Sequence, residues 1–235
     1  MAAKSLIKFT YPLVSHPRIP ALYHRQVGLA LDVVTPDEEQ FLLNLSRRKL
    51  RRQPFHPAHF DRVIAGYRES QCSHWRVGVD PVAAERDESK ARTIFQRMYA
   101  ALEQHASTRP VKWLPEHVLE LDAASGAIGP HVDHVLASGP IVSALVLGGG
   151  DAVPVEFAHV DKPDEWNASV LVPPRSLYFQ CDDLRYDFTH AVPKPPGRAR
   201  ISIMFRDTFD RSLVPERAME RHQRLQSQGM QQRQF

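Results

Sequence analysis

The chain has 235 residues but only two cysteines, Cys72 and Cys181. Two cysteines are too few for a disulfide framework and favour a reducing compartment. No run approaches the roughly 18 consecutive apolar residues of a membrane-spanning helix, so we expect no membrane span. The net charge of +3 is too small to indicate nucleic-acid binding by itself. With 43% hydrophobic residues, the chain can form one large domain with a substantial core.

Acidic residues are missing before Asp32, whereas basic residues are present at Lys4, Lys8, Arg18 and Arg25. A basic segment without acidic residues resembles a mitochondrial targeting sequence. The alternative is an ordinary basic tail, because the prolines of this segment would interrupt an amphipathic helix. We expect import into the mitochondrial matrix and treat residues 1–34 as a basic N-terminal extension.

The next part of the chain has helical periodicity. Residues 35–38 (TPDE) form a capping-box pattern with proline at the first helical position, and the helix that follows runs into the basic stretch Arg47–Arg52. Basic residues suit a helix C-terminus because of the helix dipole, although they would also bind phosphates. Apolar residues at i, i+3, i+4 and i+7 predict further helices at about 56–69 and 88–105.

After Pro115 the sequence changes to short runs rich in β-branched and aromatic residues, separated by turn-forming residues. Many short strands predict a sandwich or barrel, so we expect an α+β, mainly β fold with the helices packed against it. The domain is expected to cover residues 35–208, followed by a polar, glutamine-rich tail at 209–235 that is disordered or a weak helix. The predicted strands are 116–122, 128–135, 141–147, 153–159, 168–172, 176–180, 186–192 and 200–206.

Residues 128–149, IGPHVDHVLASGPIVSALVLGG, place two histidines and an aspartate in an apolar, glycine-punctuated stretch. Charged residues are rarely buried unless they are paired or bind a metal. In a strand, His131 and Asp133 would point to one face and His134 to the other. The pattern therefore predicts two metal ligands, His131 and Asp133, with His134 as the alternative ligand.

A third ligand is expected on a later strand with apolar neighbours. His190 in LRYDFTHAV fits, since Tyr186, Phe188 and His190 would alternate along one face. Two histidines and one carboxylate leave three adjacent coordination positions open, which is the arrangement of non-haem Fe(II) oxygenases. His131, Asp133 and His190 are therefore the candidate catalytic metal site.

The strand RARISIMFRD places Arg200, Ser202 and Arg206 on one face, opposite an apolar face. A guanidinium on the polar face of a buried strand needs an anionic partner that accepts two parallel hydrogen bonds. A small dicarboxylate cosubstrate would supply that partner. The alternative is a structural ion pair with Asp187 or Asp207.

The order of these motifs, HVD at 131–133, then His190, then Arg200 and Arg206, resembles the AlkB-type 2-oxoglutarate- and Fe(II)-dependent dioxygenases. The resemblance covers about residues 35–207 and implies a double-stranded β-helix, or jelly roll. It also rests on the segments RRQPFHPAHFDRVIAGYRES, HVLELDAASGAIGPHVDH, SLYFQCDDLRYDFTHAV and GRARISIMFRD.

The resemblance implies Fe(II) as metal and 2-oxoglutarate and O2 as cosubstrates. Arg200 would pair with the distal carboxylate of 2-oxoglutarate, and the hydroxyl of Tyr178 would also reach this cosubstrate. Arg206 would lie near its other end or near the substrate, and Ser202 lies on the same strand face. The expected reaction is hydroxylation or demethylation of a protein, RNA or small-molecule substrate.

The sequence departs from the family pattern in two places. The Asn-x-Tyr segment that precedes the metal strand in DNA-repairing members is replaced by LELDAASG at 119–126. The paired strands of a nucleotide-recognition lid are not expected either, because the region before His131 is predicted to be helical. The resemblance therefore supports the oxygenase core, with an exposed and wide site, but not duplex repair.

Two other protein classes compete with this interpretation. One is a jelly-roll metalloenzyme without a cosubstrate, against which Arg200 argues. The other is a non-catalytic or regulatory subunit of a mitochondrial RNA–protein assembly such as the mitochondrial ribosome. In that case Arg47–Arg52 and the tail at 209–235 would be the contact surfaces.

Overall fold

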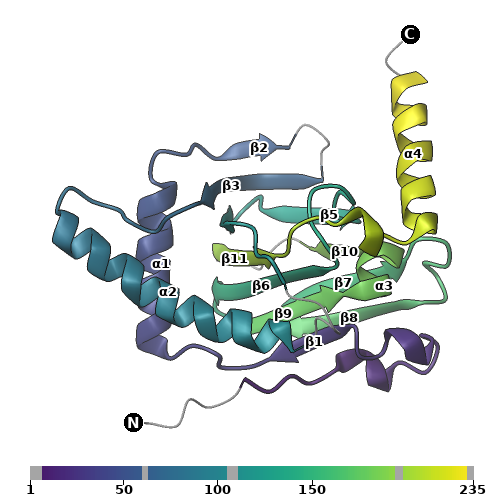
Figure 1. Ribbon diagram of the computed structural model, residues 1–235, viewed down its shortest axis with the longest axis horizontal. Coiled ribbons are helices and arrows are strands. Elements are labelled where there is room, and N and C mark those ends of the chain that lie inside the picture. Colours follow the sequence, from purple (N-terminus) through teal and green to yellow (C-terminus); the bar gives the residue numbers. More distant parts are fainter. Residues whose placement is uncertain (1–6, 60–62, 105–110, 194–197, 232–235) are drawn as a thin grey trace.

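The computed structural model describes residues 7–59, 63–104, 111–193 and 198–231. In these residues the strands form one antiparallel sheet in the order β1-β9-β6-β11-β4-β3-β5-β10-β7-β8, with β2 paired to β3 (Figure 1). The strands are β1 (Val27–Ala30), β2 (His56–Ala58), β3 (Ile64–Cys72), β4 (Glu116–Leu121), β5 (Ala127–His131), β6 (Ile141–Gly148), β7 (Val153–His159), β8 (Asn167–Val172), β9 (Ser176–Cys181), β10 (Phe188–Val192) and β11 (Arg200–Arg206).

Strand β3 joins the two layers of the sandwich. Its first residues pair with β5, and from Tyr67 onward it pairs with β4. One layer consists of β1, β9, β6, β11 and β4, and the other consists of β5, β10, β7 and β8. Apolar residues of both layers are buried between them. The predicted α+β, mainly β jelly roll is confirmed.

The helices are α1 (Pro36–Leu50), α2 (Pro81–Glu103), α3 (Asp182–Asp187) and α4 (Glu216–Gln231), with 3-10 turns η1 (Pro12–Ser15), η2 (Ala21–Tyr23) and η3 (Arg211–Leu213). The capping box is confirmed, because Thr35 Oγ1 accepts from Glu38 N–H at 3.2 Å and Glu38 Oε2 accepts from Thr35 N–H at 3.0 Å. Helix α2 begins earlier than predicted, since Asp80 caps it and Pro81 occupies its first turn. No helix of the described residues is long and apolar enough to cross a membrane.

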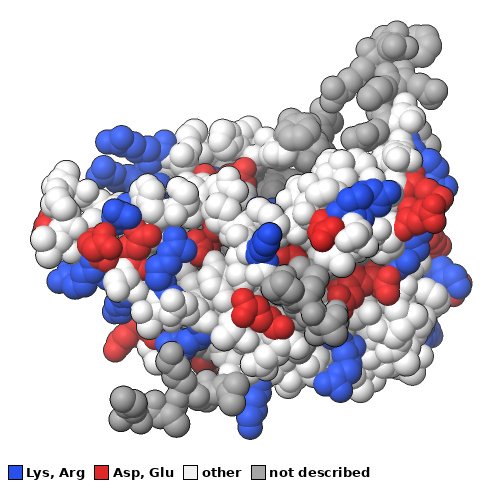
Figure 2. Space-filling model, in the orientation of Figure 1, with Lys and Arg blue, Asp and Glu red and all other residues white. Residues whose placement is uncertain are grey.

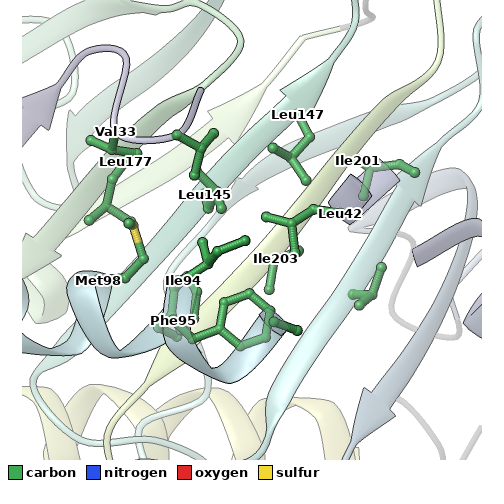
Figure 3. Packing of buried hydrophobic residues seen from close by; sticks show 14 of the residues in the cluster. Val33, Leu42, Ile94, Phe95, Met98, Leu145, Leu147, Leu177, Ile201 and Ile203 are labelled. Atoms are coloured by element: carbon green, nitrogen blue, oxygen red, sulfur yellow. The ribbon is translucent and has the colours of Figure 1, made fainter. Parts of the chain in front are cut away.

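Helices α1 and α2 cover the outer face of the first layer. Figure 3 shows Ile94, Phe95 and Met98 of α2 pointing at the strands beneath them. In β11, Ile201 and Ile203 face these helices, so Arg200, Ser202 and Arg206 face the interior of the sandwich. Each buried aliphatic or aromatic side chain stabilises the fold by roughly 1.5–3 kcal/mol, and this packing fixes the direction of the polar face of β11.

The predicted helix at 56–69 is wrong. Strands β2 and β3 occupy this region, with His56 opposite Tyr67 and Ala58 opposite Ala65. The apolar residues had helical spacing, but the long-range ladder with β4 outweighs this local periodicity. Gly66 has φ +54°, a left-handed conformation that interrupts a helix. Paired strands therefore do precede the metal strand, contrary to the expectation from the sequence.

Two further strands are shorter than predicted. The strand expected at 128–135 ends at His131, so Asp133 lies in the following loop. The strand expected at 186–192 begins only at Phe188, because Tyr186 belongs to α3. Tyr186 consequently does not share a strand face with His190.

Residues on both sides of the expected domain take part in the same folded unit. Leu13 and Ile19 are buried, and β1 extends the first layer by pairing with β9, so residue 35 is not a structural boundary. At the other end, α4 packs Ala218 and Met219 against the domain and projects away from it (Figure 1). Residues 209–231 are therefore largely helical, and 232–235 lie outside the described residues.

Candidate active site

The structure brings His131, Asp133 and His190 together at one end of the sandwich interior. His190 of β10 lies directly opposite His131 of β5. Asp133 Oδ1 is 3.3 Å from His131 Nε2 and 4.0 Å from His190 Nε2. One candidate ligand atom from each residue lies within 4.8 Å of the others, and this is the one such group found among the described residues. The three residues offer a two-histidine, one-carboxylate ligand set.

Both imidazoles turn Nε2 toward the centre. His131 Nδ1 lies 3.0 Å from the carbonyl oxygen of Gly129, which can accept its proton, so Nε2 would be the atom that binds a metal once the proton that it donates to Asp133 has left. His190 Nδ1 lies 3.0 Å from the side-chain amide of Gln180. Burial, aided by the neighbouring His131, lowers the pKa of His190 to about 3. The ring is therefore neutral near pH 7, as a metal ligand must be.

The loop that carries Asp133 is held by Arg185, a buried residue of α3. Its guanidinium donates to the carbonyl oxygens of Asp133 at 2.9 Å, His134 at 3.3 Å and Gly139 at 3.2 Å. Burial opposes ionisation of Asp133, but the hydrogen bond from His131 and nearby positive charge outweigh it and hold the pKa of Asp133 well below its usual range. The hydrogen bonds from Arg185 thus fix the position of Asp133, which was predicted to be fixed by a strand.

His134, the alternative ligand, lines the outer cavity described below and contacts helix α4. Its ring packs edge-to-face against His222 of α4, with 4.6 Å between the centroids. Burial, together with His222 and Arg185, lowers the pKa of His134. His134 does not belong to the group of ligand atoms found in the described part of the chain.

A cavity of about 260 Å³ extends from the three candidate ligands to Arg200. Arg200 is 2% exposed, and its Nε and Nη1 have no hydrogen-bond partner. The two aspartates considered as structural partners have other contacts: Asp187 accepts from Tyr23 and Arg217, and Asp207 Oδ1 accepts from the backbone of Ile141. A buried guanidinium without an anion is costly, so this end of the cavity fits an anionic group.

The remaining predicted cosubstrate residues line the same cavity. Tyr178 projects into it from β9; burial raises the pKa of its hydroxyl against the opposing charge of Arg200, so the hydroxyl stays protonated and can donate. Ser202 lies between the two arginines of β11 on the same face.

Arg206 belongs to a row of polar side chains that the sequence did not indicate. Arg206 Nη2 donates to His117 Nδ1 at 3.0 Å, and His117 Nε2 lies 2.9 Å from Glu69 Oε2. The three residues come from the neighbouring strands β11, β4 and β3, and all line the cavity. The hydrogen bond that Glu69 accepts from His117, against the effect of burial, lowers the pKa of Glu69. The hydrogen bond to His117 thus holds the guanidinium of Arg206 in place at the cavity wall.

The site opens outward between the β2–β3 strand pair and α4. A second cavity of about 340 Å³ shares His59, Ile64, His131 and Asp133 with the first. Its outer wall comes from α4, through Ala218, Arg221, His222 and Leu225. The candidate metal site therefore has an inner chamber that ends at Arg200 and an outer chamber between the two walls.

Among the solved structures that resemble this chain are two prolyl hydroxylases. One is a prolyl-4-hydroxylase from Pseudomonas putida, with TM-score 0.55, 16% identity, and coverage of 79% of this chain and 93% of that chain. The other is a prolyl hydroxylase from Trichoplax adhaerens in complex with a peptide fragment of the hypoxia inducible factor oxygen degradation domain, with TM-score 0.58, 11% identity, and coverage of 81% and 88%. At these identities they show the fold alone. The fold is therefore a jelly roll, and it carries a two-histidine, one-carboxylate ligand set of the kind that non-haem Fe(II) oxygenases use.

The sequence comparison places the chain within this class. No family model matches. Two relatives bear the name "Alpha-ketoglutarate-dependent dioxygenase alkB homolog 7, mitochondrial". The Mus musculus protein is 30% identical over 186 residues, 74% of each chain, and the Bos taurus protein is 30% identical over 180 residues, 72% of each chain. The chain belongs to the AlkB family of α-ketoglutarate-dependent dioxygenases, whose cofactors are Fe(II) and 2-oxoglutarate (α-ketoglutarate).

Proposed function

We propose that the chain is an active dioxygenase in which His131, Asp133 and His190 hold Fe(II) and Arg200 binds the distal carboxylate of 2-oxoglutarate. The observation that carries this proposal is the buried Arg200 guanidinium, which has two unpartnered nitrogens in the same cavity as the three candidate ligands. When bound, the cofactors supply O2-dependent oxidation of a substrate C–H bond, coupled to conversion of 2-oxoglutarate to succinate and CO2.

The chain's own contribution is binding, orientation and exclusion of water. The protonated hydroxyl of Tyr178 and that of Ser202 offer hydrogen bonds beside Arg200. We place Arg206, held by His117, near the other end of the cosubstrate or near the substrate. Apolar side chains complete the wall and limit competing water; they include Leu119, Leu121, Ile128, Val142 and Val192.

The substrate would enter through the outer chamber, between the β2–β3 pair and α4. Hydroxylation and demethylation both begin with oxidation of a C–H bond, so this geometry serves either reaction on a protein, RNA or small molecule. The names of the mouse and cattle relatives include "mitochondrial". Together with the basic N-terminal segment free of acidic residues, this supports a mitochondrial location, and we propose the matrix.

Contact with an RNA–protein assembly stays a prediction. Within Arg47–Arg52, Arg48 Nη2 lies 2.6 Å from Asp87 Oδ2, so part of the basic charge is paired inside the chain. On the face that Figure 2 shows, acidic and basic side chains of the described residues are mixed. Sedimentation of the native protein from organelle lysate tests this prediction, because a purely monomeric species would contradict it.

Succinate formation tests the proposed activity. With Fe(II), 2-oxoglutarate and O2, the wild-type protein should form succinate above the level of the double variant His131→Ala/Asp133→Ala. Comparing modified nucleosides and peptides in samples treated with the two proteins would then identify the substrate class. Equal succinate from wild type and double variant with every candidate substrate would refute the proposed activity.

A further inference from the structure

We infer that Gln180 is a positioning residue for the metal site, and that its amide carbonyl holds the proton of His190 on Nδ1 so that Nε2 is free to bind the metal. This inference rests on the proposed function, because it takes His190 to be a ligand. Gln180 itself was not singled out by any motif in the sequence.

Gln180 reaches its position from the opposite layer of the sandwich. It lies on β9, where Tyr178 and Gln180 point into the interior because residues two apart share a strand face. His190 lies on β10, in the other layer. The Gln180 side chain is 1% exposed and places its amide nitrogen 3.0 Å from His190 Nδ1. The amide therefore bridges the two layers directly behind the candidate ligand.

The chemistry of a metal-binding imidazole decides which amide atom must face it. His190 Nε2 points toward Asp133, 4.0 Å from its Oδ1, so Nε2 is the nitrogen that would bind the metal. Its lone pair is available only when the proton of the neutral ring sits on Nδ1. A buried Nδ1–H needs an acceptor, and the Gln180 amide lies within hydrogen-bond distance of it.

The Gln180 amide can supply that acceptor. Its Oε1 is buried and has no hydrogen-bond partner, while Nε2 faces His190. A half-turn of the terminal amide exchanges the two atoms and brings the carbonyl to His190 Nδ1 without moving the rest of the side chain. With the carbonyl in this position, the amide selects the ring tautomer that binds metal.

The acceptor for Nδ1 of His190 is a side chain, whereas the acceptor for Nδ1 of His131 is a backbone carbonyl. The acceptor for His131 Nδ1 is the backbone carbonyl of Gly129, which no substitution removes. For His190 the acceptor can be removed by mutating Gln180. Loss of the hydrogen-bond partner of a ligating histidine typically weakens metal binding by about 10–100-fold, and we expect that loss here.

The test is the affinity for Mn(II), measured by isothermal titration calorimetry without 2-oxoglutarate. Gln180→Leu keeps a similar volume but offers no acceptor, so Mn(II) binding should weaken by about 10–100-fold. Gln180→Glu offers an acceptor oxygen in either protonation state and should bind Mn(II) at least tenfold more tightly than the leucine variant. Ser176→Ala is the matched control, because Ser176 is a buried polar residue on the same face of β9 and should leave the affinity unchanged.

The outcomes separate this inference from the proposed function. If Gln180→Leu binds Mn(II) as tightly as wild type while His131→Ala does not bind it, Gln180 has no positioning role and the metal site stands. A wild-type protein that fails to bind Mn(II) overturns both. Thermal melting without metal shows whether each variant is folded, and Gln180→Met replaces the leucine variant if the latter is unfolded.

Discussion

Replacing Arg200 by alanine separates metal binding from cosubstrate binding. Arg200 contributes no ligand atom to the His131, Asp133 and His190 group, so Arg200→Ala should bind Mn(II) nearly as well as wild type. The guanidinium is buried and has unpartnered nitrogens at the far end of the cavity. Its removal should therefore abolish the stabilisation by 2-oxoglutarate but not the binding of Mn(II).

The size of the effect follows from the burial of Arg200, which is 2% exposed. Charge-assisted bidentate hydrogen bonds are roughly twice as strong as neutral ones, and breaking a buried ion pair costs about 3–5 kcal/mol. At about 1.4 kcal/mol per factor of ten, this corresponds to a hundredfold or greater loss of affinity for 2-oxoglutarate. Arg200→Lys should recover only part of it, because an ammonium group lacks the planar fork of a guanidinium.

The assay is a thermal-shift titration with 2-oxoglutarate in the presence of Mn(II), since a ligand that binds only the native state raises Tm. Arg198→Ala is the matched control: Arg198 is an exposed arginine two residues earlier and should leave the titration unchanged. Arg206→Ala should have a milder effect or change substrate choice. If Arg200→Ala responds to 2-oxoglutarate as wild type does, Arg200 is structural and the proposed cosubstrate site is refuted.

Three further predictions concern stability. Glu116→Ala should lower the free energy of unfolding in urea by about 3 kcal/mol or more, because it leaves the partners of a buried carboxylate without their acceptor; a change below 1 kcal/mol would contradict this. The donors to Glu116 are Trp75, Arg92 and Tyr99. The hydrogen bond from Arg97, against the effect of burial, lowers the pKa of Glu38. The folded protein therefore binds this proton less tightly than the unfolded chain, and the stability from the pair is full above the unfolded-state pKa and lost as pH falls through the folded-state value. The free energies of unfolding of wild type and Glu38→Gln, measured against pH, should therefore differ most near neutral pH and converge as pH falls through that window. Gly66→Ala should cost about 1–3 kcal/mol by chemical denaturation, because Gly66 has φ +54° and a Cβ would lie 2.5 Å from the backbone of a neighbouring turn. Gly129→Ala, whose Cβ would lie 3.5 Å from the carbonyl oxygen of Val63, should be tolerated.

Local patterns were sufficient for the parts of the structure that local chemistry determines. The cap at Thr35 is a four-residue signal, and it marks the start of α1 correctly. The inward direction of Arg200 follows from simple alternation with Ile201 and Ile203, which pack on the helices. The close approach of His131 and His190 followed from the ligand types that a metal needs, although their pairing across β5 and β10 was not readable from the sequence.

The misassigned and missed features all depend on distant parts of the chain. The region 56–69 has helical spacing, but its partner β4 begins at Glu116 and no local pattern signals that ladder. Arg185 bonds the carbonyl oxygen of Asp133, 52 positions earlier, and Arg206 bonds His117, 89 positions earlier. Gln180 was within reach of inference, because it lies two residues beyond Tyr178 on the same strand face.

The position of β11 determines when the site forms during folding. It is the last strand among the residues that the structure describes, yet it lies in the middle of the sheet between β6 and β4. Neither neighbour can complete its ladder until residues 200–206 have been synthesised, so the sheet cannot assemble stepwise from the N-terminus. We expect one late, cooperative and comparatively slow folding step, as is typical of chains dominated by non-local pairing. Because Arg200 begins this strand, the anion-binding end of the cavity should form only in that final step.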